Sequence, residues 1–216
     1  TAAHVRETAA AHFAPETVHD SGAAEREPEP APLEAHTSGV PRALQMSQSN
    51  EWYTPSQYIE AARRVMGSID LDPASNPFAN ETVKAGRYFT AEDDGLKQAW
   101  HGNVWMNPPY GRDGGESNQG IWSARLVEQY RAGSVTAAVM LVNAVTDRTW
   151  FAALWDFAIC FTDHRIRFYD EQGEAGSPTH GNALVYMGED RVRFAEEFSQ
   201  FGPVVMQVVR GADTLI

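Results

Sequence analysis

A short motif joins an amide, a rigid turn and an aromatic ring directly after an apolar stretch at 104–106, and its residues are Asn107, Pro108, Pro109 and Tyr110. An amine conjugated to an aromatic ring is a poor nucleophile, because its lone pair is delocalised into the ring. The Asn107 side chain and the Pro108 backbone each offer a carbonyl that can accept one amine hydrogen and so localise that lone pair. Consecutive prolines keep these carbonyls aimed in one direction. The motif therefore predicts methylation of a planar amino group.

The Tyr110 ring offers a flat face on which a base taken out of a duplex can stack, and stacking contributes roughly 1–3 kcal/mol per base. The structural alternative is a Pro-Pro turn that closes a strand, with Tyr110 as a core or rim aromatic. Such a tetrapeptide is expected by chance in only about one chain of this length in a hundred. The chemical interpretation is therefore favoured.

Three separated segments resemble, in order, the motifs of phage-type DNA N-6-adenine methyltransferases, and they span residues 50–55, 69–75 and 107–110. The resemblance covers roughly residues 50–190. It implies S-adenosylmethionine as the cofactor and double-stranded DNA with a flipped base as the partner. We expect no metal, because no His, Cys and Asp cluster has metal-ligand spacing. The resemblance also assigns catalysis to Asn107, Pro108, Pro109 and Tyr110.

Ligands of open α/β sheets bind at the carboxyl ends of the strands, which is where Asp70 and Asp72 fall. We expect Asp72 to meet the methionyl amine of the cofactor. The turn at 73–76 lacks the glycines that methyltransferases usually place there, and an ordinary Asp-Pro turn is the alternative. The cofactor contacts that the resemblance implies are Tyr53, Thr54, Pro55, Asp70, Asp72, Pro73, Ser75, Asp94 and Asn107.

Two of these assignments have a simpler alternative. Thr54 as N-cap, Pro55 at the first helical position and Gln57 in a capping box would begin a helix without any ligand. The acidic segment at 92–96 resembles the one that other adenine methyltransferases place under the cofactor adenine, and Asp94 is the residue we expect to bind. An exposed acidic turn would have the same composition.

Two further segments are candidates for contacts with the substrate. The loop at 111–120 holds four glycines and is predicted to be mobile, either as a lid over an extruded base or as a plain connector. Residues 164–168 alternate cations with apolar side chains, as a phosphate-binding strand or any half-exposed strand would. The expected substrate contacts are Tyr110, Arg112, Arg165 and Arg167.

The apolar pattern alternates between helical and strand periods. Helices are predicted at 55–66, 122–130, 150–155 and 191–201, and strands at 69–71, 104–106, 135–142, 158–161, 165–169, 183–187 and 204–209. This order predicts a doubly wound, mostly parallel α/β sheet of the Rossmann-like, S-adenosylmethionine-dependent methyltransferase type. Residues 49–216 are expected to form that domain. Residues 1–48, with five of the twelve prolines, are expected to be a disordered acidic arm.

Composition further limits the expected number of domains and the compartment of the protein. A chain of 216 residues with 43% hydrophobic content can bury one good core. The single Cys160 lies in an apolar run and is expected to be a buried thiol in a reducing compartment. The apolar stretch at 135–145 is shorter than the ~20 residues of a spanning helix, and no signal peptide is evident. We therefore expect a cytoplasmic protein, in a bacterial host cell if a phage encodes it.

The net charge of −12 opposes the expectation of DNA binding. Residues 1–48 hold three Arg and seven Asp/Glu, which leaves 14 cations and 22 anions in the rest of the chain. DNA-binding proteins normally neutralise phosphates with cations. Three hypotheses remain: a DNA adenine-N6 methyltransferase with a short or relaxed sequence context, a methyltransferase for another planar amine such as a protein glutamine or an RNA base, and a non-catalytic binding module.

Overall fold

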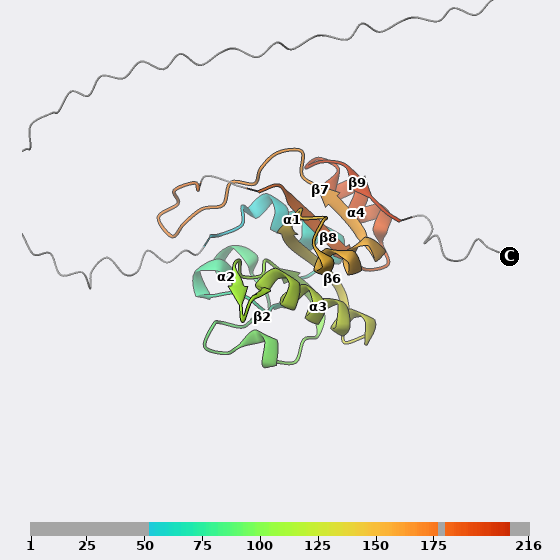
Figure 1. The fold of residues 1–216 in the computed structure, drawn as a ribbon. Coiled ribbons are helices and arrows are strands. Elements are labelled where there is room, and N and C mark those ends of the chain that lie inside the picture. The colour runs from blue at the N-terminus through green and yellow to red at the C-terminus, as the bar shows by residue number, and fades with distance from the viewer. Residues whose placement is uncertain (1–51, 177–179, 208–216) are drawn as a thin grey trace, which may run out of the picture. The chain divides into compact units, whose positions relative to one another are not determined.

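A seven-stranded mixed sheet forms the centre of the computed structural model, which describes residues 52–176 and 180–207 (Figure 1). The predicted arm at 1–48 lies outside the described residues. The strand order is β2-β1-β3-β6-β8-β7-β9. The strands are β1 (Leu71–Asp72), β2 (Arg87–Tyr88), β3 (Gly102–Met106), β6 (Val135–Asn143), β7 (Ala158–Phe161), β8 (Asn182–Met187) and β9 (Val204–Val205).

The sheet has a parallel half and an antiparallel half. Strands β2, β1, β3 and β6 pair in parallel. β8 runs antiparallel to both β6 and β7, and β9 runs antiparallel to β7. The predicted α/β class is confirmed. The carboxyl ends of the parallel strands meet at one edge, which is where a ligand site is expected in such a sheet.

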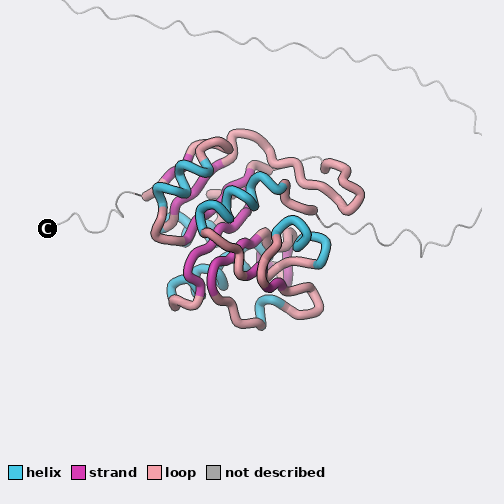
Figure 2. The backbone as a smooth tube through the Cα atoms, turned by 180° about the vertical axis from the view of Figure 1, so that it is seen from behind, coloured by secondary structure: helices cyan, strands magenta, loops and turns pink. Residues whose placement is uncertain are grey.

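Helices cover both faces of this sheet, as a doubly wound fold requires (Figure 2). One face carries α1 (Ser56–Met66) and α4 (Arg191–Phe198), and the other carries α3 (Asn118–Arg131) and the 3-10 helix η3 (Thr149–Asp156). Strand β6 is buried on both sides because its side chains alternate between the two cores. From residue 137 onward, its residues in the α1-side core are Ala137, Val139 and Leu141, and those in the α3-side core are Ala138, Met140 and Val142, which Val135 joins from the start of the strand.

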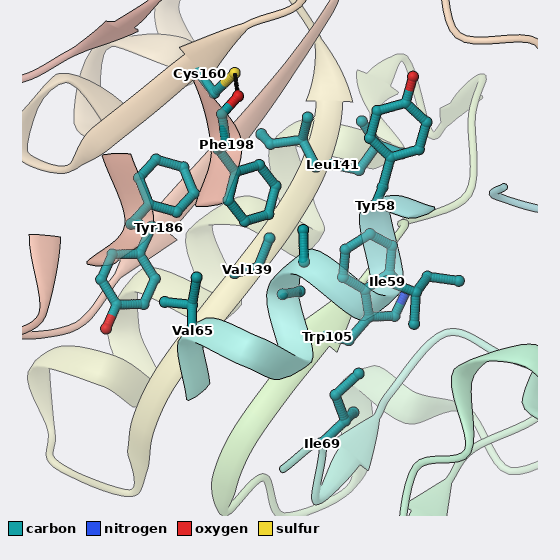
Figure 3. Close-up of a cluster of buried hydrophobic side chains, with 14 of the residues drawn as sticks. Tyr58, Ile59, Val65, Ile69, Trp105, Val139, Leu141, Cys160, Tyr186 and Phe198 are labelled. Carbon is teal, nitrogen blue, oxygen red and sulfur yellow. Dashed lines mark hydrogen bonds between the residues drawn. The ribbon is translucent and has the colours of Figure 1, made fainter. Parts of the chain in front are cut away.

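The hydrophobic core on the α1 side packs helix α1 against the middle of the sheet, as Figure 3 shows. Tyr58 and Ile59 of α1 are 1% exposed, and Trp105 of β3 is equally buried. Burial of each large apolar side chain contributes roughly 1.5–3 kcal/mol, so these contacts fix the position of the first turn of α1. Cys160 lies in the same core, where its thiol contacts the Phe198 carbonyl oxygen at 3.4 Å, and burial raises its pKa to about 12.

Several predicted element boundaries are wrong. Helix α1 begins at Ser56, and Thr54 does not cap it. Helix α3 begins at Asn118, inside the predicted glycine loop, and the rest of that loop forms a two-stranded hairpin of β4 (Arg112–Asp113) and β5 (Glu116–Ser117). The predicted helix at 150–155 is the 3-10 helix η3, and helix α4 ends at Phe198, short of Phe201. Strand β9 covers Val204–Val205 only, and residues 208 and 209 of the longer predicted strand lie outside the described residues.

Residues 165–169 are not a strand, although the predicted alternation of exposure is present. Arg165 and Arg167 are exposed and Ile166 is fully buried. Within the segment only Tyr169 forms isolated bridges, one to Tyr53 and one to Ala175. The alternating exposure of this segment therefore comes from a single buried side chain, Ile166, in a loop.

Candidate active site

A cavity of about 1030 Å³ opens at the carboxyl ends of the parallel strands. Ten of the residues singled out from the sequence line it: Tyr53, Thr54, Asp72, Pro73, Ser75, Asp94, Asn107, Pro108, Pro109 and Tyr110. The fold thus brings together segments that are separated by up to 57 positions, 53 to 110, in the chain. Helix α1 leaves room for the cavity because it begins only at Ser56.

Polar side chains form a row across four neighbouring strands at this edge, namely Asp72 of β1, Asn107 after β3, Asn143 of β6 and Asn182 of β8. Successive side chains of a strand point to opposite faces. The residues two positions from the asparagines belong to the α1-side core, and these are Trp105, Leu141 and Leu184. The three asparagines therefore share the α1 face of the sheet.

The Asn107 amide is held in a defined orientation. Its Nδ2 donates a hydrogen bond to Thr54 Oγ1 at 3.2 Å. Its Oδ1 is buried and has no hydrogen-bond partner within the described part of the chain. The Thr54 hydroxyl does not cap α1, and by holding Asn107 Nδ2 it leaves the unpaired carbonyl oxygen in the cavity wall. Leaving a buried acceptor unpaired costs roughly 1–3 kcal/mol, so a ligand that donates to it is favoured.

Tyr110 stands at the rim of the cavity, 40% exposed. Its ring meets the Phe168 ring edge-on, with 6.4 Å between the centroids. Asn118 Nδ2 donates to the Tyr110 carbonyl oxygen at 3.1 Å, which ties the motif to the start of α3. The two rings form an aromatic corner, and an aromatic corner of this kind is suited to a planar ligand.

Asp72 is a buried carboxylate on the cavity wall, 3% exposed. Burial raises its pKa to about 7, and contacts with the Ser75 hydroxyl and the Ala74 amide offset only part of that effect. The Ala74 N–H donates to Asp72 Oδ1 at 3.3 Å. A buried carboxylate with so few partners is suited to a cationic group of a ligand.

Asp70 does not line the cavity. Its Oδ2 accepts a hydrogen bond from the Asn103 N–H at 2.8 Å, and its Oδ1 accepts one from Ser68 Oγ at 2.9 Å. It lies at the opposite end of β1, where Gly102 packs against it so closely that a Cβ there would collide with the carboxylate. These contacts give Asp70 a structural position, outside the expected cofactor site.

The acidic segment packs directly on the turn after β1. Gly95 approaches the Pro73 carbonyl oxygen so closely that an added Cβ would overlap it. The buried Trp100 indole donates to the Gly95 carbonyl oxygen at 2.8 Å. Asp94 has a left-handed backbone, with φ 51°, and its carboxylate pairs with Lys97 Nζ at 2.7 Å. Aspartate adopts this conformation more readily than most non-glycine residues, so the turn is compatible with its sequence.

Residues 52–54 enter the cavity as an extended segment. The Tyr53 N–H donates to the Tyr169 carbonyl oxygen at 2.7 Å, and the reciprocal bond is 3.1 Å. The Tyr53 ring contacts Phe78 of α2 (Pro77–Val83), with centroids 4.6 Å apart. Gly176 lies against the Trp52 ring with no space for a Cβ. The loop at 168–176 and helix α2 therefore pack against residues 52–54 from two sides.

The geometry agrees with comparisons to known proteins. A profile of the DNA N-6-adenine-methyltransferase (Dam) family matches residues 42–196. The chain belongs to this Dam family. A DNA N-6-adenine-methyltransferase of Escherichia phage T1 is 29% identical over 102 residues, which are 46% of this chain and 38% of the phage protein. The match therefore spans less than two thirds of that relative.

The remaining candidates of this Dam-family chain lie outside the cavity lining. Pro55 precedes α1 as its N-cap residue, and Arg112 is exposed on β4. Arg165 and Arg167 are exposed in the loop after β7. Contacts of these arginines with DNA phosphates remain a prediction.

Sequence reasoning missed several residues that line the cavity, and the main ones are Trp52, Trp122, Asn143, Phe168, His180 and Asn182. Asn76, in the expected cofactor turn, also lines the cavity, but its role as N-cap of α2 was not predicted, although Asn before Pro77 is a helix N-cap signal and its Oδ1 accepts from the Ala79 N–H at 2.8 Å. Asn143 and Asn182 are polar ends of apolar strands, which also marks a strand end facing a ligand.

No helix among the described residues is both long and apolar enough to cross a membrane. No group of three or more His, Cys, Asp or Glu side chains in residues 52–176 and 180–207 could hold a metal ion.

Proposed function

We propose that this protein is a DNA adenine-N6 methyltransferase that uses S-adenosylmethionine. The observation that carries the proposal is the unpaired Asn107 Oδ1 on the cavity wall, directed there by Thr54. Membership of the Dam family supports adenine in DNA as the substrate. The residues that touch the reacting amine are Asn107 and Pro108, with Tyr110 as the stacking surface.

The residues present fit the cofactor. Asp72 is a buried carboxylate in need of a cationic partner, which the methionyl amine would supply. Asp94 and the close approach of Gly95 to Pro73 form a narrow acidic cradle beside it, suited to the nucleoside end. When bound, S-adenosylmethionine supplies an electrophilic methyl group on a sulfonium. Tyr53, Thr54, Pro73 and Ser75 complete the wall around it.

The chain itself prepares the amine for transfer. Asn107 Oδ1 and the Pro108 carbonyl oxygen accept the two amine hydrogens, which localises the nitrogen lone pair and stabilises its developing positive charge. Tyr110 and Phe168 hold the plane of the base and exclude water from one side. A base inside a duplex cannot reach this recessed wall, so the target adenine must flip out of double-stranded DNA.

The proposed domain of residues 49–216 would act in the cytoplasm of a bacterial host, because the named relative belongs to a phage. Arg112, Arg165 and Arg167, all exposed, would contact the DNA backbone.

A second substrate class is favoured by one observation, the net charge of −12. Phosphate neutralisation supplies most nonspecific DNA affinity, and an acidic protein gains little from it. The same amine-binding wall would accept another planar amine, such as a protein glutamine side chain or a base in RNA.

Labelled methyl transfer from S-adenosylmethionine to unmethylated DNA, RNA and protein in parallel tests these proposals. We expect transfer to the N6 of adenine in DNA. Asn107→Ala removes one of two amine acceptors, so we expect transfer to fall on the order of 10²-fold or more while cofactor affinity stays nearly intact. Asn80→Ala is the control, because Asn80 lies on α2 outside the cavity lining.

Transfer only to protein or RNA would select the second substrate class. Cofactor binding without transfer to any of the three would indicate a binding module. Full activity of Asn107→Ala would remove the catalytic assignment while leaving the fold and family unaffected.

A further inference from the structure

Two asparagines on the cavity wall have no part in the chemistry described so far. Asn143 ends β6 and Asn182 begins β8, and the two residues are directly opposed in the antiparallel ladder. Directly opposed residues on one face have Cβ atoms about 4.5–5.5 Å apart. Both line the cavity, and Asn182 is only 3% exposed.

The side-chain amides of this pair are unused within the described chain. Neither makes a side-chain hydrogen bond among residues 52–176 and 180–207, to the other or to any further residue. Asn143 is half-buried and Asn182 nearly fully buried, and both line the cavity. Side-chain amides that pair with no protein group there can bind a ligand.

The backbone of the pair is nevertheless fixed. The Asn143 N–H donates to Gln119 Oε1 at 3.3 Å, and the Asn182 carbonyl oxygen accepts from the Thr162 N–H at 3.1 Å. Both side chains therefore project from rigid strand ends. A group built in this way is preorganised for recognition.

The strand order separates the pair from the acidic residues. Along the sheet, Asp72 of β1 lies on one side of Asn107, and Asn143 and then Asn182 lie on the other. Adjacent strands are about 4.8 Å apart, so Asn143 lies one strand and Asn182 two strands, about 10 Å, beyond Asn107. A purine whose amine is held by Asn107 would extend over this side of the cavity, where both side chains can reach its ring edge. The half of the cavity beside Asp72, where the cofactor is expected, is therefore different from the half lined by Asn143 and Asn182.

We propose that Asn143 and Asn182 bind the ring edge of the target adenine and select for it. Asn107 already accepts the amine hydrogens, so the features of adenine left to read are its ring nitrogens, which are acceptors. A side-chain amide supplies the N–H donors that such acceptors need, and asparagine is the usual partner of adenine for this reason. The inference rests on the proposed function.

Asn143→Asp and Asn182→Asp test this, because each keeps the side-chain size and removes the N–H donors. Their kcat/KM is measured on a DNA duplex that the wild type methylates, and on duplexes in which 1-deaza-, 3-deaza- or 7-deaza-adenine replaces the target. We expect kcat/KM on adenine to fall on the order of 10- to 100-fold for at least one of the two variants. We expect the activity of the wild type to fall by a similar factor on one of the deaza analogues. On that analogue the variant should lose no further activity, because the side chain and the missing ring nitrogen are the two partners of one hydrogen bond.

Calorimetric titration with S-adenosylmethionine accompanies the kinetics, and thermal unfolding checks that each variant folds. Asn80→Asp is the matched control, because it makes the same chemical change outside the cavity and keeps the oxygen that accepts from the Ala85 N–H. Cofactor affinity should be unchanged in all three variants, and Asn80→Asp should keep wild-type kcat/KM.

Two outcomes overturn the inference while the proposed function stands. Wild-type kcat/KM in both cavity variants would remove the pair from base recognition, and a loss of S-adenosylmethionine affinity would assign it to the cofactor. A wild-type protein that methylates no DNA overturns the proposed function and this inference with it.

Discussion

Asp72 is the residue whose ionisation should control ligand binding. Its pKa, raised by burial from 3.8 to about 7, keeps the carboxyl largely protonated below neutral pH. A cationic ligand group beside it favours the ionised form and lowers that pKa again. Binding of such a cation must then expel a proton from the site whenever the pH is below about 7.

We predict that the contribution of Asp72 to S-adenosylmethionine affinity rises with pH up to about 7 and then levels off. Calorimetry in buffers of different ionisation enthalpy should detect the released proton. Asp72→Asn should weaken binding strongly and leave only the pH dependence of the ligand's own amine. An Asp72→Asn variant with wild-type affinity would show that another group meets the methionyl amine.

The same carboxyl affects stability in the opposite sense. Because its pKa is about 7 in the folded chain and near its ordinary value of 3.8 when unfolded, the unfolded chain loses this proton first as pH rises. The contribution of Asp72 to the free energy of unfolding therefore falls between about pH 4 and 7, and is lowest above pH 7. Denaturant unfolding of Asp72→Asn should lack this component, so the variant should gain stability relative to the wild type as pH rises.

Among the structural elements, the acidic segment and the turn after β1 depend on one close contact. Gly95 leaves no space for a Cβ beside the Pro73 carbonyl oxygen, and Trp122 lies against the same position. We predict that Gly95→Ala forces Asp94 and Pro73 apart, lowering stability by about 1–3 kcal/mol and weakening cofactor affinity. Gly86→Ala is the control, because its Cβ would meet the Asp70 carbonyl oxygen at an ordinary 3.4 Å. Equal cofactor affinity in the two variants would separate Asp94 from the cofactor site.

The sequence predicted most core elements because their apolar patterns are long or clearly bounded. Strand β6 follows the expected range almost to the residue, and Gly67 and Asp190 bound α1 and α4 as expected. The short edge strand β2 and helix α2 were not predicted, since two paired residues and seven helical residues carry little periodicity.

The site was only partly predictable for a different reason. Motifs identified the Asn107 turn and Asp72, both of which line the cavity. Local signals misassigned Thr54, because Thr before Pro is a typical helix start, while its hydroxyl instead accepts from Asn107, 53 positions later. Phe168 and Asn182 reach the cavity only through strand order and loop packing, which local sequence patterns do not specify.

At the scale of the whole molecule, charge limits how the protein can hold DNA. Residues 49–216 contain 14 cations and 22 anions, since the first 48 residues hold three of the 17 cations and seven of the 29 anions. Under the proposed function, DNA affinity would depend on a few well-placed cations and on contacts with an extruded base. Such binding weakens as salt screens the phosphate contacts.

The described chain after Tyr110 also provides few elements that could read a long DNA sequence. Outside the core helices and strands, it offers mainly the β4–β5 hairpin and the connection at 162–181, of which residues 177–179 are not described. Segments of this size present only a few side chains to base edges. We therefore predict methylation of adenines in a short or relaxed sequence context, with DNA affinity that falls steeply as salt rises. Sequencing the methylated positions in DNA exposed to the protein, at two salt concentrations, checks both statements. A strict site of six or more bases would require a recognition element beyond the described residues, and the segment at 1–51 would be the first to delete.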